Sequence, residues 1–474
     1  MIQKIFIILA CLFTLSVQAA KPLNVVLILV DDLGWMDLSC QGSRYFETPH
    51  IDRLAAEGMR FTDAYAACAV CSPTRAAVQT GRYPGRLGVT DWIRSRFQGG
   101  TIPTDKKNPS GFSGGKRKFL VPKNALWMES EEVTIAELLK PAGYVTCHIG
   151  KWHLGADDWY PQKQGYDFNY GGCDYGQPPS YFDPFNQPKH RHAMIRVGIP
   201  HLPGRKPGQY LSDREAEEAV AFIEKHKDKP FFLNMDNYAV HTPIQAKAEV
   251  TAKYAKKPKT TQKNAKYAAM VESVDDSAGR IMDALEKHGI ADRTMIIFTS
   301  DNGGLVGPTS NAPLRSGKGY AYEGGIRVPL IIKWPGVVKP GVTSAEPVTS
   351  VDYLPTIAEV TGLDLPKGRA IDGISLAKHL SSQGKQSIER EAIYWHFPHY
   401  RHNPGPYSII REGPWKLIKF YEGPMELFNL KDDLGETKNL ASVMPEKVKE
   451  LNSRLLAHLK SIGAKMPKLN SARQ

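Results

Sequence analysis

The chain has 474 residues, more than a single hydrophobic core usually holds, which predicts one large domain together with a smaller one. Its formal net charge of +12 indicates a polyanionic partner. The sequence carries no recognisable nucleic-acid-binding module and, after its first residues, no apolar run long enough to cross a bilayer. Neither a nucleic-acid partner nor a membrane span is therefore expected.

Residues 1–20 have the pattern of a secretory signal. Lys4 supplies the charged start, residues 5–15 the apolar run, and Val17-Gln18-Ala19 a small-residue cleavage site. Cys11 ends a weak lipoprotein-like box, but the apolar residues after it argue against that alternative. We expect an exported protein, periplasmic or secreted, whose net charge falls from +12 to +11 once Lys4 is removed.

Residues 24–30 form a continuous apolar run that predicts a fully buried parallel strand, and Asp31 and Asp32 follow it directly. Two carboxylates just past a buried strand are costly to bury without a cation, so a hard metal ion is their natural partner. The alternative is a solvated turn.

Cys71 lies at the start of a short predicted helix. Ser72 suits the N-cap, Pro73 the first helical position and Gly81 the stop after the last turn. The free N–H groups of a helix N-terminus would place Cys71 where an anion binds, with Arg75 one turn further in. This arrangement suits attack on a tetrahedral oxyanion; the alternative is an ordinary buried cysteine.

Several later elements also end in polar residues. A capping box at Thr134–Glu137 opens a helix, and the predicted strand 144–149 leads into Lys151 and His153. A second capping box, Ser212–Glu215, opens a helix that runs to about residue 227. Taken alone, Lys151 and His153 would be ordinary loop residues.

The strand predicted over 230–235 leads into His241, which precedes a Thr-Pro pair. An amphipathic helix is predicted over 264–288, and we expect Asp275 and Asp276 on its solvated side.

A further buried strand over 294–299 is followed by Asp301 and Asn302, and Lys318 lies in a glycine-flanked loop before the next strand. Each polar cluster thus falls past the carboxyl end of an apolar run. In open α/β sheets ligands bind at that edge, so we expect these clusters to converge on one site.

Two long basic insertions, 92–123 and 181–209, interrupt the alternation of strands and helices. Long irregular segments in a compact domain are functional loops or disorder, and we favour walls of a substrate cleft over solvated insertions.

The C-terminal part follows a polar linker at 381–391. We expect short strands at 393–396, 408–411 and 415–420 and a closing helix at 446–462. His396, His399 and His402 are evenly spaced, but Pro398 and the local composition argue against a helical zinc site. The predicted organisation is a signal over 1–20, a catalytic domain over 21–380 and a C-terminal subdomain over 392–474.

The remaining cysteines leave the disulfide pattern open. Export permits bridges among Cys40, Cys68, Cys147 and Cys173. Cys147, however, lies in an apolar run and suits a small buried hydrophobe, so we predict no specific pairing.

The run Cys71-Ser72-Pro73-Thr74-Arg75 with Thr80-Gly81 resembles the signature of the type I sulfatases, a family of the alkaline phosphatase superfamily. Thr74 departs from the more usual serine or alanine, and we expect it to be tolerated. The resemblance covers nearly the whole mature chain, because the clusters at 31–32, 150–153, 241–243, 301–304 and 318 and the segments 408–411, 415–418 and 426–430 occur in family order.

This resemblance implies an alkaline-phosphatase-like α/β fold: a doubly wound mixed sheet flanked by helices, with a smaller C-terminal α+β subdomain. It also implies that a maturation enzyme oxidises Cys71 to formylglycine. One hydroxyl of the hydrated aldehyde would attack sulfur, and the other would expel sulfate by rebuilding the aldehyde, which a plain thiol cannot do.

The resemblance further implies the roles of the site residues. One calcium ion would be held by Asp31, Asp32, Asp301 and Asn302 and would touch the modified residue 71. Arg75, Lys151, His241 and Lys318 would orient the hydrate and clamp the sulfate, and His153 would accept a proton. Either His241 or Lys318 would protonate the leaving oxygen, a choice that stays open.

The expected activity is hydrolysis of sulfate esters on a sulfated carbohydrate, which export and the basic insertions favour. The alternatives are a phosphonate or phosphate monoester hydrolase of the same superfamily, and a protein that binds sulfated glycans without turning them over. The sugar, the hydroxyl position, exo or endo action and the oligomeric state stay open.

Overall fold

The computed structural model describes residues 22–96, 100–191, 193–204 and 206–471. The predicted signal over 1–20 lies outside the described residues. Within the described ranges, no helix combines the length and apolar character needed to cross a membrane.

An eight-stranded mixed sheet forms the centre of the molecule, in the order β11-β2-β10-β9-β1-β8-β6-β7. The run from β9 to β7 is parallel, and β10 is antiparallel to both of its neighbours. This confirms the doubly wound α/β class. The strands are β1 (Asn24–Val30), β2 (Met59–Phe61), β6 (Val145–Gly150), β7 (Phe168–Tyr170), β8 (Phe231–Asn237), β9 (Thr294–Ser300), β10 (Leu330–Lys333) and β11 (Val342–Ser344).

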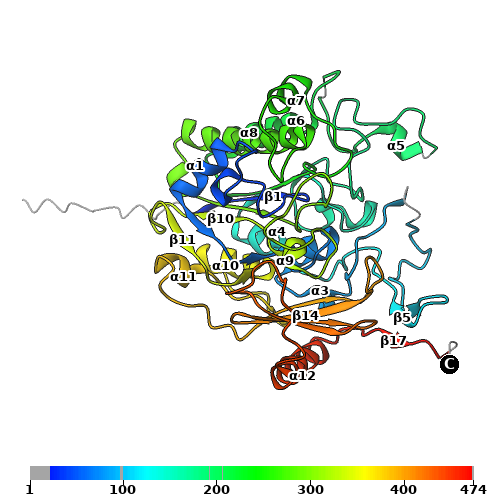
Figure 1. The fold of residues 1–474 in the computed structure, drawn as a ribbon. Helices are drawn as coiled ribbons and strands as arrows, with labels where there is room; N and C mark the ends of the chain where they lie inside the picture. The colour runs from blue at the N-terminus through cyan, green and yellow to red at the C-terminus, as the bar shows by residue number, and fades with distance from the viewer. Residues whose placement is uncertain (1–21, 97–99, 192, 205, 472–474) are drawn as a thin grey trace, which may run out of the picture.

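Helices cover both faces of this sheet (Figure 1). One face carries α1 (Pro49–Glu57), α6 (Leu211–His226), α7 (Ala248–Ala255) and α8 (Ala265–Lys287). The other face carries α2 (Cys71–Thr80), α4 (Ile135–Leu139), α10 (Tyr353–Val360) and α11 (Ala377–Ser381).

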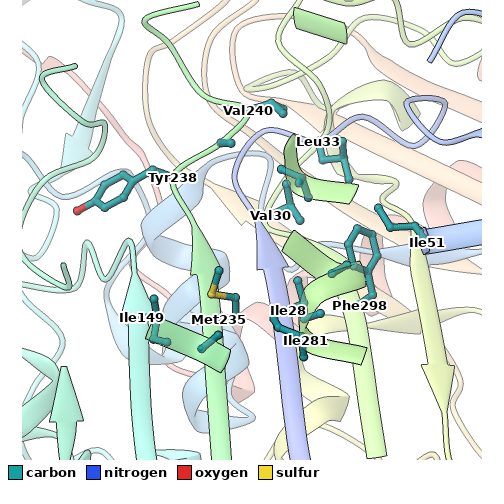
Figure 2. Close-up of a cluster of buried hydrophobic side chains, with 14 of the residues drawn as sticks. Ile28, Val30, Leu33, Ile51, Ile149, Met235, Tyr238, Val240, Ile281 and Phe298 are labelled. Atoms are coloured by element: carbon teal, nitrogen blue, oxygen red, sulfur yellow. The ribbon is translucent and has the colours of Figure 1, made fainter. Parts of the chain in front are cut away.

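Side-chain alternation along β1 explains why its sequence is apolar throughout. Val26, Ile28 and Val30 belong to the core beneath α6 and α8, whereas Val25 and Leu27 belong to the opposite core beneath α2 and α10. Figure 2 shows the first core, in which Ile28 lies near Met235 of β8 and Phe298 of β9. Burying one such side chain contributes about 1.5–3 kcal/mol, so a polar residue on either face would be costly.

The C-terminal part contains a four-stranded antiparallel sheet whose outer face is covered by α12 (Pro445–Ser461). Its strands are β13 (Ile393–Phe397), β14 (Tyr407–Glu412), β15 (Trp415–Phe420) and β16 (Met425–Asn429). The sequence predicted the first three strands and the helix. Trp395 and Ile409 share a core with Tyr65 and Val70, so this sheet buttresses the segment that leads into Cys71.

Smaller elements complete the chain. They are β3 (Ala64–Tyr65), β4 (Phe112–Ser113), β5 (Phe119–Pro122), β12 (Val348–Thr349), β17 (Lys468–Leu469), α3 (Pro84–Leu87), α5 (Ala193–Val197), α9 (Glu323–Ile326), and the 3-10 turns Ser39–Gln41, Lys140–Ala142, Asp157–Trp159, Pro161–Lys163, Ala291–Arg293 and Ser350–Asp352. The C-terminal strand β17 pairs with β5, so the end of the chain is tied to the first basic insertion (Figure 1).

Two local predictions, one about the start of α6 and one about the exposed side of α8, were wrong. The box predicted at Ser212–Glu215 does not cap α6, which begins at Leu211 without a side-chain cap; Glu215 is buried instead and accepts a hydrogen bond from Asn237 Nδ2 at 3.1 Å. Asp275 is not solvated: it is 1% exposed and accepts hydrogen bonds from the backbone N–H groups of His50 and Ile51 at the start of α1. The capping box at Thr134 is confirmed.

Candidate active site

The polar clusters meet at one edge of the central sheet because the strands before them are parallel and in register. Val30 of β1 pairs with Asn237 of β8 and with Ser300 of β9. Gly150 of β6 pairs with Asp236 of β8. The segments that follow these four strands therefore leave the sheet at the same level, as a doubly wound sheet requires.

Cys71 is the first residue of α2 and is 3% exposed. Ser72 is not the N-cap, contrary to expectation: Val70 holds that position, and the Ser72 hydroxyl donates to the His153 carbonyl at 3.0 Å. Gly81 ends the helix with a φ of 67°, as predicted. Burial raises the pKa of the Cys71 thiol to about 11, so the unmodified thiol stays protonated at neutral pH.

Arg75 lies one turn further along α2 and is 1% exposed. Its Nε donates to Asp301 Oδ2 at 2.9 Å and its Nη1 to the Lys151 carbonyl at 2.8 Å. Nη1 also lies 3.3 Å from Asp236 Oδ2. Arg75 therefore binds the carboxylates beneath Cys71, which stabilises the ends of β6, β8 and β9 against one another.

Two lysines pair with the aspartates that follow β1. Lys151 Nζ lies 2.7 Å from Asp31 Oδ2, and Lys318 Nζ lies 2.6 Å from Asp32 Oδ1. Both lysines are nearly inaccessible to solvent. Although burial opposes it, the Asp32 carboxylate raises the pKa of Lys318, so this lysine carries a positive charge at neutral pH.

The loop that carries Lys318 is held close to Asp301 by glycines. A Cβ on Gly303 would collide with the Gly324 carbonyl. The Lys318 N–H donates to the Gly304 carbonyl at 3.0 Å. The close approach of these backbones explains the Gly303-Gly304 pair after Asn302.

The residues at this edge fit a hard divalent cation. Asp31 Oδ1, Asp32 Oδ2 and Asn302 Oδ1 are buried and accept no hydrogen bond from the described residues. Ligand atoms of Asp31, Asp32, Cys71 and His241 all lie within 4.8 Å of one another. Unsatisfied buried oxygens from carboxylates and an amide are the ligands that such a cation prefers.

The balance of charge supports the same interpretation. The buried carboxylates exceed the buried cations by one in the described part of the site: Asp31, Asp32, Asp236 and Asp301 against Arg75, Lys151 and Lys318. Burial raises the pKa of Asp31 to about 8 despite the Lys151 ammonium, with Asp301 and Asp32 adding to the shift. A bound cation would offset this unfavourable burial of negative charge.

Asp301 differs from the other expected ligands. Its Oδ1 accepts from the Asp32 N–H at 3.2 Å and its Oδ2 accepts from Arg75, so each oxygen already has one hydrogen-bond donor and keeps a further lone pair for a cation. Asn302 Nδ2 donates to Asp32 Oδ1 at 2.8 Å, which leaves its Oδ1 free to bind a cation.

One ring nitrogen of His153 accepts no hydrogen bond from the described residues. Its Nε2 lies 2.7 Å from the Ile93 carbonyl, and because a carbonyl can only accept, Nε2 carries the proton. Nδ1 is buried and has no hydrogen-bond partner among the described residues. Burial, with the nearby Lys151 and Arg75 charges, lowers the pKa of His153 well below its usual range. The neutral ring therefore offers Nδ1 as a proton acceptor.

His241 is oriented by its own backbone neighbour. Its Nδ1 lies 2.9 Å from the Thr242 carbonyl, so Nδ1 carries the proton in the neutral ring. Its Nε2 lies 3.6 Å from Asp32 Oδ2. Burial and the Lys318 charge lower the pKa of His241 to about 3.

A cavity of about 190 Å³, here called the sulfate cavity, opens above Cys71. Its lining includes Cys71, His153, His241 and Lys318 from the predicted set, together with Val70, Trp92, Gly176, Gln177 and Arg401. Arg75, Lys151 and the aspartates lie beneath it. A Cβ on Gly176 would lie 2.8 Å from His153 Nε2, so only glycine allows this approach.

Sequence reasoning missed several residues of the site and its support. Asp236 lies within the buried strand β8, and Arg401 lies in the loop that also contains His399 and His402. Asp37 is also buried and accepts from Tyr267 Oη at 2.6 Å, and Tyr267 Oη lies 3.2 Å from the Asp32 carbonyl. The one sequence signal for Asp236 is that it is a charged residue within an otherwise largely apolar strand.

Other predicted features lie elsewhere. Cys40, Cys68, Cys147 and Cys173 form no disulfide with one another or with Cys71. His396 contacts Ser408, His399 contacts Thr90, and His402 stacks on Tyr320, so these histidines do not converge.

The two basic insertions have different positions. The described residues of 181–209 do not line the sulfate cavity. Tyr181 Oη instead donates to the Tyr238 and His241 carbonyls at 2.6 and 2.8 Å, which supports the His241 loop. Residues of 92–123 line a second hollow beside the sulfate cavity.

Comparisons with known proteins agree with this geometry. The profile described as "Sulfatase" matches residues 23–363, and the profile described as "N-sulphoglucosamine sulphohydrolase, C-terminal" matches residues 316–465. A sulfatase of Formosa agariphila is 34% identical, covering 93% of this chain and 89% of that protein. Arylsulfatase A of Homo sapiens is 30% identical, covering 92% and 87%.

Among solved structures, Ps i-CgsB in complex with k-i-k-neocarrahexaose superposes with a TM-score of 0.77 at 30% identity, covering 93% of each chain. The family profile spans most of the chain, and the relatives are matched over most of their own length. The chain therefore belongs to the sulfatase family of the alkaline phosphatase superfamily and is a sulfuric ester hydrolase.

Proposed function

We propose that this sulfatase removes sulfate from a sulfated carbohydrate, using a formylglycine made from Cys71 and one bound calcium ion. The observation that carries the proposal is the position of Cys71 in a small cavity lined by His153, His241 and Lys318. Formylglycine supplies a geminal diol, whose hydroxyl is the nucleophile that a buried, protonated thiol cannot provide.

Asp31, Asp32, Asp301 and Asn302 would hold the calcium ion next to residue 71. The oxygen-rich set supports calcium, and the ion supplies positive charge where negative charge grows on the sulfate oxygens. Arg75 keeps Asp301 and Asp236 in place beneath residue 71. Lys151 does the same for Asp31.

The chain's own residues then provide orientation and proton transfer. Lys318 and His241 flank the cavity and would contact sulfate oxygens, while Arg75 and Lys151 keep the charged floor in place. His153 Nδ1 is free to accept a proton from residue 71. Trp92 and Val70 contribute the apolar part of the cavity lining.

Hydrogen-bond geometry favours Lys318 over His241 as the donor to the leaving oxygen. The proton of the neutral His241 ring lies on Nδ1, which faces the Thr242 carbonyl, so Nε2 has none to give. The Lys318 ammonium has protons beyond the one directed at Asp32.

Three observations support a sulfated carbohydrate as substrate. The chain has a net charge of +12, and the sulfate cavity is bordered by the exposed Arg401. Ps i-CgsB, a structural relative, has been solved in complex with k-i-k-neocarrahexaose. We also propose that the protein is exported, to the periplasm or beyond, and that a formylglycine-generating or equivalent enzyme modifies Cys71.

The test is ion-detected release of sulfate from sulfated oligosaccharides and an aryl sulfate, and of the free phosphonate from a phosphonate ester, with mass analysis of the peptide that contains residue 71. We expect sulfate release, and a loss of at least about 10⁴-fold in Cys71→Ala, as for removal of a nucleophile. Cys68→Ala is the matched control, because Cys68 is equally buried but does not line the cavity.

Each other outcome assigns a different function. Faster release of phosphonate than of sulfate would make the enzyme a phosphonate monoester hydrolase. Binding of sulfated glycans without release of any product, in protein whose residue 71 is modified, would leave the binding-only alternative.

A further inference from the structure

We infer that this sulfatase binds a second anionic group of its carbohydrate in a basic cleft that continues from the sulfate cavity. The inference rests on the proposed function and extends it, because it makes the substrate a polyanionic saccharide rather than a sugar with a single sulfate. The second group is a sulfate or a carboxylate on the same or a neighbouring sugar.

The basic cleft is a hollow of about 420 Å³ whose lining includes Arg94, Arg117, Lys123 and Tyr400. Trp92 lines both this cleft and the sulfate cavity, so the two spaces adjoin. Arg117 and Tyr400 also line a third hollow of about 630 Å³. A saccharide whose sulfate occupies the cavity above Cys71 would extend past Trp92 to reach Arg117.

The walls of the cleft are fixed by contacts between segments far apart in the sequence. Asn470 Nδ2 donates to the Gly115 and Arg117 carbonyls, each at 3.0 Å, next to the β17–β5 pairing. The Phe119 N–H donates to Tyr400 Oη at 3.0 Å. Arg117 lies over the Tyr400 ring, 4.1 Å from its centroid. The first basic insertion is therefore anchored to both the C-terminal sheet region and the chain end.

The cations of the cleft have no carboxylate partner among the described residues. Within the described residues, no carboxylate forms an ion pair with Arg94, Arg117 or Lys123, and all three are exposed. Two cations of the same insertion that line neither hollow are paired: Arg96 lies 2.8 Å from Asp157, and Lys106 lies 2.5 Å from Asp158. The lining of the cleft therefore carries positive charge that no ion pair among the described residues compensates, which would suit an anion. Lys107 of the same insertion is also without an ion pair among the described residues, but it lines neither hollow.

The other residues of the cleft suit a sugar. Trp92 and Tyr400 contribute aromatic rings to the lining, and Arg94 lies 5.5 Å from the Trp92 ring centroid. Asp91 is the carboxylate of the lining; burial raises its pKa to about 6, so it opposes the cations only weakly near that pH. The cleft therefore combines aromatic surface with a net positive charge, the combination that binds anionic saccharides in water.

The experiment measures binding of the full-length protein to dextran sulfate hexasaccharide, oligogalacturonate hexasaccharide and neutral dextran hexasaccharide by calorimetry, and hydrolysis of an aryl sulfate. We expect Arg117→Gln with Lys123→Gln to weaken binding of an anionic hexasaccharide by about 10-fold, because each exposed charge contributes at most a few-fold. The KM for the aryl sulfate should change by less than about 2-fold, because that substrate does not reach the cleft. The two anionic probes distinguish recognition of sulfate from recognition of carboxylate.

Lys107→Gln is the matched control, since Lys107 is an exposed lysine of the same insertion that lines neither hollow. Equal binding of the anionic hexasaccharides by wild type and the double variant would overturn the inference, as would an equal loss in Lys107→Gln. Failure of the proposed function is distinguishable: wild type would then release no sulfate from any ester, while the binding measurements would still report on the cleft.

Discussion

Arg75, beneath the sulfate cavity, is 1% exposed and lies within 3.7 Å of three carboxylates. Arg117, in the basic cleft, is exposed and forms no ion pair with the described residues. The same guanidinium group serves the protein itself in the first case and is left available to a ligand in the second. Buried, paired charges build the floor of the cavity, whereas the exposed cations without carboxylate partners are those we propose to bind the substrate. The two regions should therefore respond differently to substitution.

The largest effect is expected for Arg75→Ala. Removing one partner of a buried ion pair leaves uncompensated carboxylates, which costs about 3–5 kcal/mol of unfolding free energy. Arg117→Ala should change the unfolding free energy by less than about 0.5 kcal/mol, since Arg117 is exposed. Urea unfolding of both variants checks this difference. Arg75→Lys should recover little of the lost unfolding free energy, because an ammonium group cannot make the two-pronged contact of the guanidinium with Asp301 and the Lys151 carbonyl. A stable, active Arg75→Ala enzyme would contradict the role given to the paired floor.

Removal of the cation should also destabilise the catalytic floor. A ligand present at 100 times its dissociation constant contributes about 2.7 kcal/mol of stability, so a chelator should lower the thermal midpoint and calcium should restore it. Asp31→Asn should abolish this response.

Asp275→Asn is the matched control for that experiment. Asp275 is equally buried, but its carboxylate accepts from backbone N–H groups at the start of α1, remote from Cys71. This variant should lose stability yet keep the response to chelator. A chelator response that survives in Asp31→Asn would place the cation elsewhere.

The buried histidines near the floor should make the stability of the protein sensitive to acid. Burial lowers the pKa of His148 from 6.5 to about 3, and its Nδ1 accepts from Asn234 Nδ2 at 3.1 Å. A folded pKa below the unfolded one means that stability is complete above pH 6.5 and is lost as pH falls from 6.5 towards 3.

The loss should amount to about 1.4 kcal/mol per pH unit for this histidine. His148→Gln should therefore flatten the dependence of unfolding free energy on pH by that slope, whatever its effect on stability at neutral pH. Denaturant unfolding at several pH values between 4 and 8 measures the slope. An unchanged slope would mean that His148 is protonated in the folded protein.

The smallest effect is expected at Arg401, which stands where the two regions meet. It lines the sulfate cavity, packs over Gly319 next to Lys318, and is exposed. Arg401→Gln should raise the KM for both aryl sulfate and oligosaccharide by about 3-fold with little change in kcat, as for the loss of one exposed charge contact. Arg401→Lys should return the KM for both substrates to nearly the wild-type value. An effect confined to oligosaccharides would assign Arg401 to the cleft instead.

Much of the fold follows from local sequence patterns. The apolar runs at 24–30, 230–235 and 294–299 are strands of the central sheet, and the amphipathic pattern over 264–288 is the helix α8. These predictions succeed because a strand that is buried on both faces is apolar throughout. A helix that is buried along one side repeats its apolar residues with the helical period. The strand β16 was missed because Met425–Asn429 is short and lacks a clear alternation.

The sequence by itself determined which residue types follow each strand and that a helix begins near Cys71, since both depend on neighbours along the chain. Only the tertiary structure decided their partners. Arg75 binds Asp301 and Asp236, Asp275 caps α1, and Arg117 faces a cleft bounded by Tyr400 and the chain end. Such contacts join segments separated by up to several hundred residues, and they depend on strand order and burial, which no local pattern encodes.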